Sequence, residues 1–298
     1  MKGRIVSVSY WPAPLRYYEA VATDRSAYNE VIGAMEQAAA AIKASKPQTI
    51  LILSRYHLTL NDAIGYSPQA RLRGAIPLAN GTTFTVGMET DSTFNAALRK
   101  SSERMGIPLT SILDSLPIIS TDDYFLHHTA TIPLHFLAEQ GLGNKQIVRL
   151  TMGRLSYEEL YTFGKVVQLA AEASGRQVAV IGSANLLPNH WVNGRDKNLD
   201  TNINVMYALG DQQPRVLQTL GYPPGEEYSL RTASFVLGAV SGLKATVGTH
   251  HFSSVAGETY GLIQYDVKVG NNEEELREYI PTRESELNIG LNQIDGKY

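Results

Sequence analysis

Near-continuous apolar segments alternate along the chain with segments in which apolar residues recur at helical spacing. Between residues 31 and 42, for example, apolar positions mark one face of a helix that stops before Pro47. This helix follows one apolar run and precedes another, and such a β-α-β opening predicts the α/β class. The runs with the composition of strands buried on both faces of a parallel sheet are Ile5–Tyr10, Thr49–Leu53, Gln146–Met152 and Val178–Ile181.

Capping signals and turn composition predict the remaining elements. We expect helices from Asp91 or Ser92 to about Met105, over 129–140, from a Ser156–Glu159 capping box to Gly175, and over 196–209, 215–220 and 226–240. The composition of residues 61–90 predicts a long segment that leaves the sheet, with one strand over 83–88. Residues 116–126 are expected to be irregular. Strands over 246–252 and 259–267 are expected to close the sheet as an antiparallel pair.

These elements together predict one α/β domain with a mixed, mostly parallel central sheet and helices on both faces. No internal repeat, low-complexity tract or linker interrupts the pattern. We assign residues 1–270 to this domain. Residues 271–298 are assigned to a C-terminal charged helix and an extended arm.

The composition narrows the class of protein. Hydrophobic residues make up 43% of the chain and charged residues 18%, which argues against disorder. The net charge of −3 gives no electrostatic reason to expect nucleic acid or an anionic membrane as a partner. The absence of cysteine removes disulfides, thiolate metal sites and cysteine nucleophiles. Because neither a signal-peptide core nor a membrane-spanning apolar run is found, we expect a cytoplasmic protein.

Candidate chemistry lies in the histidines and in the loops that follow strands. The sequence contains no Gly-x-Gly-x-x-Gly, Walker loop, Gly-x-Ser-x-Gly or His-Glu-x-x-His motif. Imidazole together with carboxylate could hold non-haem iron or zinc, but no close spacing of these residue types indicates such a site. The loop after the strand at 178–181 is where open α/β sheets usually place a ligand. The seven histidines are His57, His127, His128, His135, His190, His250 and His251.

Several segments resemble one family in the same order along the chain. They are Leu126-His-His-Thr-Ala-Thr-Ile-Pro-Leu-His-Phe-Leu137, residues 155–183, Ser229-Leu-Arg-Thr-Ala-Ser-Phe-Val-Leu-Gly-Ala-Val-Ser-Gly242 and Gly257-Glu-Thr-Tyr-Gly-Leu-Ile263. They are similar to segments of the class III extradiol ring-cleavage dioxygenases, the family of the larger subunit of protocatechuate 4,5-dioxygenase. The resemblance implies Fe(II) held by two histidines and a glutamate, a catechol or aminophenol substrate, and a further histidine as acid and base.

The residues at these positions depart from the pattern that the resemblance implies. Where the first histidine ligand is expected, the chain reads Ser9-Tyr-Trp-Pro-Ala-Pro14. The second ligand position falls on Tyr56, with His57 one residue later. The acid/base position falls in Ala184-Asn-Leu-Leu-Pro188, with His190 two residues beyond it. Glu227 stands at the carboxylate position, and His128 matches a histidine that lines the substrate pocket.

The resemblance therefore assigns candidate roles to six residues. The candidate catalytic residues are His128 and His190; the candidate substrate-binding residues are Tyr10, Tyr56 and His128; the candidate metal ligands, used only if the chain holds its own iron, are His57 and Glu227.

Structural roles remain open for the same positions. Glu227 could be a dipole partner at a helix start, and His127 with His128 could cap the helix that follows them. His190 could belong to a structural loop, and Arg231 could pair with a carboxylate.

Three functions follow from these observations. Because the histidine positions have changed, we expect a subunit of an aromatic ring-cleavage dioxygenase that lacks a complete Fe(II) site and supports a catalytic homologue, as in two-subunit members such as 2-aminophenol 1,6-dioxygenase. An active dioxygenase with a rearranged centre, which draws on His57, His190 and Glu227, is the first alternative, and it would require Fe(II). A non-enzymatic protein that binds a small aromatic is the second. The expected partners are the catalytic homologous subunit or further copies of the chain, and a small aromatic ligand.

Overall fold

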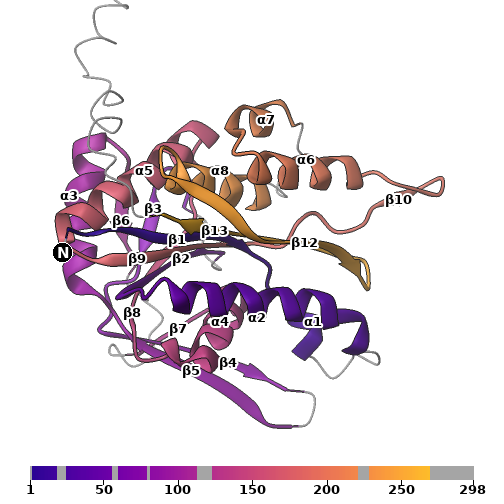
Figure 1. Cartoon of the computed structure of the whole chain (residues 1–298), viewed down its shortest axis with the longest axis horizontal. Coiled ribbons are helices and arrows are strands. Elements are labelled where there is room, and N and C mark those ends of the chain that lie inside the picture. The colour runs from indigo at the N-terminus through magenta and orange to yellow at the C-terminus, as the bar shows by residue number, and fades with distance from the viewer. Residues whose placement is uncertain are drawn as a thin grey trace, which may run out of the picture.

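The strands of the largest sheet follow one another in the order β12-β13-β1-β9-β2-β8-β3-β6 (Figure 1). The computed structural model describes residues 2–18, 25–55, 60–78, 81–112, 123–220 and 228–268. The two long excursions at the right of Figure 1 are the β12–β13 hairpin and the loop that carries β10.

Four parallel strands form the centre of this sheet. Neighbouring strands pair in the order β1, β9, β2 and β8, and almost every residue in them is buried. Burial on both faces explains why these segments are apolar nearly without interruption, and the four predicted strands are confirmed. Their bounds are Arg4–Trp11 for β1, Gln177–Ser183 for β9, Thr49–Ser54 for β2 and Gln146–Thr151 for β8.

Shorter or antiparallel strands flank this centre on either side. β13 (Glu258–Val267) pairs antiparallel with β1, and β12 (Ala245–Val255) pairs antiparallel with β13. On the other side β3 (Ile64–Tyr66) runs antiparallel to β8, and β6 (Leu109–Ser111) runs parallel to β3. The sheet is therefore mixed, with a parallel centre, and the predicted antiparallel pair at one end is confirmed.

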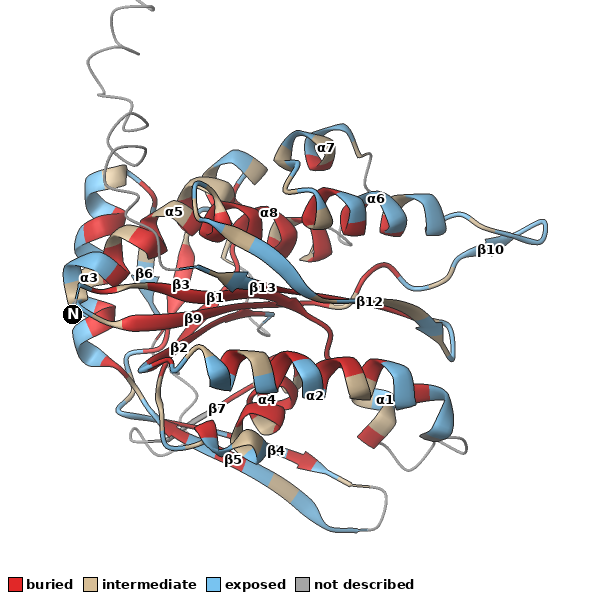
Figure 2. Ribbon diagram, viewed as in Figure 1, coloured by how far each residue is buried: buried red, intermediate tan, exposed pale blue. Residues whose placement is uncertain are grey.

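Helices cover both faces of the sheet, each over its own hydrophobic core (Figure 2). One core packs beneath the five helices α3, α5, α6, α7 and α8, and the other beneath α2 and α4. The predicted α/β class with helices on both faces is confirmed. The helix bounds are Leu15–Tyr18 for α1, Asn29–Ala44 for α2, Ser92–Met105 for α3, His128–Leu137 for α4, Tyr157–Ser174 for α5, Leu199–Gly210 for α6, Pro214–Thr219 for α7 and Tyr228–Val240 for α8.

The excursion over residues 61–90 contains more strand than the sequence predicts. β4 (Arg71–Pro77) pairs with β5 (Thr83–Glu89) and with β7 (Asp123–Phe125) in a separate three-stranded sheet. Only β5 was expected, and the prediction of irregular structure is wrong over 123–125. β4 alternates exposed and buried residues, but Gly74 interrupts its apolar face because a Cβ there would lie 2.3 Å from the Thr131 hydroxyl oxygen of α4.

Local signals set several element boundaries. The Asp91 side chain accepts a hydrogen bond from the Phe94 N–H at the start of α3, and Ser156 with Glu159 forms the predicted capping box of α5. The helix expected from residue 196 begins instead at Leu199, after a hairpin of β10 (Trp191–Val192) and β11 (Arg195–Asp196). The Asp196 carboxylate explains the shift, because it accepts hydrogen bonds from backbone N–H groups of this loop rather than starting a helix.

Two short helical turns complete the described elements. A 3-10 turn, η1 (Arg25–Tyr28), precedes α2, and a π-helical turn, η2 (Ala138–Leu142), follows α4. The predicted charged helix and arm over 271–298 lie outside the described residues, so the boundary at residue 270 stays a prediction. No helix within the described ranges is long and apolar enough to cross a membrane.

Two glycines allow α5 and α8 to pack closely. A Cβ on Gly238 would lie 1.9 Å from the Tyr161 carbonyl oxygen, and one on Gly164 would lie 2.3 Å from the Ala239 nitrogen. These are backbone atoms of the facing helix, which cannot move without separating the two helices.

We expect Gly238→Ala to lower the free energy of unfolding by about 1–3 kcal/mol, because the added methyl group forces the two helices apart. Gly33→Ala in α2 is the matched control, since nothing lies within 4 Å of its added Cβ. That change should instead stabilise the protein by roughly 0.5–1 kcal/mol through helix propensity. Urea denaturation of both variants measures the difference, and equal effects would contradict the close packing.

Candidate functional site

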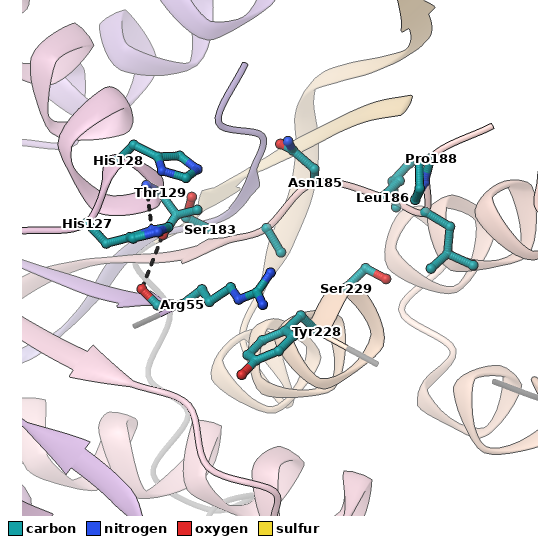
Figure 3. A pocket seen from close by; sticks show the side chains of 12 residues that line it. Arg55, His127, His128, Thr129, Ser183, Asn185, Leu186, Pro188, Tyr228 and Ser229 are labelled. Carbon is teal, nitrogen blue, oxygen red and sulfur yellow. Dashed lines mark hydrogen bonds between the residues drawn. The ribbon is translucent and has the colours of Figure 1, made fainter. Parts of the chain in front are cut away.

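A pocket of about 360 Å³ opens at the carboxyl ends of the central parallel strands, between the first turns of α4 and α8 (Figure 3). Open α/β sheets bind ligands at this edge, where the loops of neighbouring strands leave toward opposite faces. β1 leads to α2 on one face, whereas β9 leads to α6 on the other. The lining residues are Arg55, His127, His128, Thr129, Ser183, Ala184, Asn185, Leu186, Leu187, Pro188, Tyr228 and Ser229.

The turn that follows β1 is buried and is held by the loop that follows β9. Trp11 and Ala13 are fully buried. The Asn185 side chain accepts a hydrogen bond from the Ala13 N–H at 2.7 Å and donates one to the Ala13 carbonyl at 3.4 Å. The Ala184 N–H donates to the Trp11 carbonyl at 2.9 Å. The backbone of Ala184 and the side chain of Asn185 therefore join the end of β1 to the end of β9 beside the pocket.

The same loop after β9 is also held from its outer side. The Leu187 N–H and carbonyl bond the side chain of Asn202 in α6, at 2.9 and 2.8 Å. The Asn198 amide donates to the Pro188 carbonyl at 2.8 Å. These contacts fix the pocket wall formed by residues 184–188.

Two consecutive histidines stand at the start of α4. His127 is the N-cap: its Nδ1 accepts a hydrogen bond from the Thr129 N–H at 3.3 Å and lies 2.9 Å from the Thr129 hydroxyl. That hydroxyl donates to the Arg55 carbonyl at 3.3 Å, which joins α4 to the end of β2. The rings of His127 and His128 lie 3.9 Å apart. The predicted capping role is thus confirmed for His127, and His128 lines the pocket beside it.

Arg55 gives the pocket a positive charge. It follows β2 directly, and its guanidinium carbon lies 4.8 Å from the ring centroid of Tyr228 at the start of α8 (Figure 3). The Arg55 side chain is exposed, and no aspartate or glutamate is among the lining residues that the structure describes. A guanidinium stays charged at any physiological pH. An anionic group is therefore the ligand that this part of the pocket favours.

Polar atoms also lie at the last positions of the four parallel strands, and one of these residues, Ser183, lines the pocket. Trp11, Ser183, Ser54 and Thr151 are register partners across β1, β9, β2 and β8, so their side chains share one face of the sheet. The indole nitrogen and the three hydroxyls are buried and have no hydrogen-bond partner within the described ranges. Buried polar atoms normally have partners. We therefore expect a water molecule or a ligand to form hydrogen bonds with these four groups.

The structure brings one of the predicted site residues into the pocket and leaves two others outside it. His128 lines the pocket. Tyr10 is fully buried in the core that α5 and α8 cover, and His190 is exposed in the loop before β10, where its N–H donates to Asp196. The roles predicted for these residues stay predictions.

The remaining candidates, Tyr56, His57 and Glu227, lie outside the described residues. Arg55 and Tyr228, which are next to them in sequence, both line the pocket. The functions predicted for the three candidates therefore stay untested.

Sequence reasoning missed Arg55 and Asn185. Arg55 and Asn185 each follow a buried strand within two residues, and that position at the carboxyl end was the available signal. The Arg231 guanidinium donates to the Leu155 carbonyl and lies over the Tyr157 ring at 5.6 Å; its pairing with a carboxylate stays a prediction.

An iron that activates oxygen requires donors that the described lining does not provide. The facial set consists of two imidazoles and one carboxylate. The described lining offers two imidazoles, both from the start of α4, and no carboxylate. One of the two, His127, is already engaged as the helix cap. Within the described ranges, no group of three histidine, aspartate or glutamate residues could hold a metal ion. The described residues alone therefore do not fit the iron centre that the family resemblance implies.

Comparison with known proteins supplies a family. Residues 8–207 match the family model described as "Catalytic LigB subunit of aromatic ring-opening dioxygenase". No curated protein matches the sequence. Among solved structures, the crystal structure of an uncharacterized protein from Escherichia coli K12 is similar at 10% sequence identity, with a TM-score of 0.44, over 87% of this chain and 99% of that chain.

We expect Asn185→Ala to destabilise the protein by about 1–3 kcal/mol, because the Ala13 N–H and carbonyl lose their side-chain partner in a buried turn. Asn204→Ala is the matched control, since Asn204 is exposed on α6, and its effect should stay within about 0.5 kcal/mol. Urea denaturation measures both. Equal stability of the two variants would show that the Asn185 bridge does not hold the turn.

Proposed function

The chain belongs to the family of the catalytic LigB subunit of aromatic ring-opening dioxygenases, and we propose that it is a ligand-depleted subunit of such an enzyme. In this proposal it binds an aromatic molecule in the pocket at the carboxyl ends of β2 and β9 and associates with a homologous subunit that performs the oxygen chemistry. The fold of the family is retained, while function depends on the residues placed on that fold.

The observation that carries the proposal is the turn after β1. A histidine ligand is expected there from the family resemblance, and the chain has Trp11-Pro12-Ala13-Pro14. Asn185 and Ala184 hold this buried turn through three hydrogen bonds. No histidine precedes His57 in the sequence, so a small movement of this turn could not supply an imidazole.

The loop after β9 supports the same conclusion. Residues 184–188 form the pocket wall where an acid/base histidine is expected, and they contain no group that can transfer a proton near neutral pH. Asn198 and Asn202 hold this loop by its backbone. His190 lies beyond it and is exposed.

What the described residues can do is bind and orient an aromatic ligand. The cavity of about 360 Å³ is at the lower end of the range for small-molecule sites. Tyr228 offers an aromatic surface, Arg55 offers a cation at the mouth, and His128 offers a ring nitrogen. Bound Fe(II), where a subunit carries it, supplies the activation of oxygen; the residues described in this chain supply binding and shape.

Metal and oxygen measurements on the purified chain test this proposal. We expect less than about 0.1 iron per chain after reconstitution with Fe(II), and no oxygen uptake with catechol or 2-aminophenol, because the facial donor set is incomplete. Co-expression with a homologous catalytic subunit should yield a complex that consumes oxygen. One iron per chain together with ring cleavage by the chain alone would refute the proposal.

An active enzyme with rearranged ligands is the second candidate. It is favoured by one observation: Arg55 and Tyr228, the described sequence neighbours of His57 and Glu227, line the same pocket and contact each other. In this case His57→Ala and Glu227→Gln would each abolish iron binding, and His190→Ala would lower turnover. Unchanged iron content in the first two variants would exclude it. Saturable binding of an aromatic, with neither metal nor a partner subunit, would instead indicate a binding protein.

Arg55 should make the pocket selective for aromatics that carry a carboxylate. We expect Arg55→Gln to weaken binding of 3,4-dihydroxybenzoate by about tenfold or more, since charge-assisted hydrogen bonds contribute about 1.5–3 kcal/mol. Binding of uncharged catechol should change little. Arg99→Gln on the exposed surface of α3 is the matched control. Titration calorimetry on the three proteins measures the affinities, and equal loss for both ligands would contradict a charge-specific role.

A further inference from the structure

β12 forms one edge of the large sheet in the part of the chain that the structure describes. It pairs with β13 on one side and, within the described ranges, with no strand on the other. At eleven residues it is the longest strand described, which corresponds to roughly 35 Å of extended backbone. None of its residues is buried, whereas seven of the ten in β13 are (Figure 2).

The usual protections of an edge strand are largely missing from β12. Natural edges are kept short or carry lysine, proline or an inward-pointing charge, since a long uncharged edge pairs with other chains. The residues 245–255, Ala-Thr-Val-Gly-Thr-His-His-Phe-Ser-Ser-Val, include no proline, lysine, arginine, aspartate or glutamate. The opposite edge of the same sheet, β6, has three residues and is protected by its shortness. A single register shift interrupts β12, between Val247 and Thr249, which leaves residues 249–255 regular.

A second copy of the chain is the partner that fits this edge. A two-fold axis places a strand antiparallel to its own copy, and antiparallel pairing is the mode that β12 already uses with β13. Because the strand carries no lysine, arginine or carboxylate, the two copies bring no fixed like charges together. No complementary sequence is needed, since backbone N–H and carbonyl groups supply the pairing.

Exposed apolar side chains beside the strand enlarge the surface that pairing would cover. α6 packs against β12, and its Ile203 and Tyr207 are 47% and 55% exposed. They are four residues apart, so they share one face of the helix. Val247 of β12 is 39% exposed. A strand pair alone buries less than a stable interface requires, and these exposed side chains are the candidates for the additional apolar area.

We propose that the protein forms a two-fold dimer in which β12 of one copy pairs antiparallel with β12 of the other, so that one sheet continues across both copies. None of the residues that line the pocket lies on β12 or α6, so both pockets stay open in the dimer. The inference does not rest on the proposed function. A catalytic homologue could bind this chain through surfaces other than β12.

A charge placed on the edge tests the proposal. His250 is exposed within the regular part of β12. We expect the wild-type chain to run at twice the monomer mass in sedimentation, and His250→Lys to raise the dimer dissociation constant by roughly tenfold or more, because each copy then carries a lysine within the paired edge. Thr110→Lys on β6 adds the same charge to the opposite edge, where Thr110 is exposed, and should leave the dimer unchanged. Matching circular dichroism spectra would show that both variants fold.

Hydrogen exchange of the wild-type chain gives an independent readout. Backbone amides of residues 249–255 should lose protection as the protein is diluted, because the outer N–H groups are bonded only in the dimer. A monomer at every concentration would overturn the proposal, and so would a dimer that His250→Lys leaves intact. Protection that does not depend on concentration would show that the chain covers its own edge, for instance with residues 269–298. Association with a homologous subunit only would likewise exclude the second copy.

Discussion

The hydrogen bonds that join the end of β1 to the loop after β9 are the constraint on which the candidate site depends. Asn185 bonds both backbone groups of Ala13, and Ala184 bonds the Trp11 carbonyl. They hold the turn Trp11-Pro12-Ala13-Pro14 at a strand end where the family resemblance implies an imidazole. The turn is buried, and these three hydrogen bonds hold its backbone in place.

The pocket exists because the two faces of the sheet are covered by different helices. α4 packs on the face of one core and α8 on the face of the other, and their first turns meet at the carboxyl ends of β2 and β9. The Thr129 hydroxyl ties α4 to the Arg55 carbonyl, and the Arg55 guanidinium reaches the Tyr228 ring of α8. One residue at a strand end thus links both walls and carries the positive charge of the pocket.

Some of the site could be predicted from the sequence, and some could not. His128 was expected to line a pocket because its segment resembles the family, and it does. Asn185 was hidden because its partner, Ala13, is remote in sequence and offers only backbone groups. Arg231 bonds the Leu155 carbonyl, a backbone contact that residue identities do not reveal. Backbone partners leave no pattern in a sequence, so such contacts cannot be predicted from it.

The sequence by itself determined the class of fold and the positions of the buried parallel strands, because strands covered on both faces must be apolar almost throughout. It also determined the capping of α3 and α5, since those signals are local. Only the tertiary structure decided that residues 71–77 form a strand, because Gly74 lies against Thr131 of a remote helix. It also decided which strand is left at the edge and which side chains meet in the pocket. Those outcomes depend on pairings between segments that are far apart in the chain, and hydrophobic periodicity does not encode them.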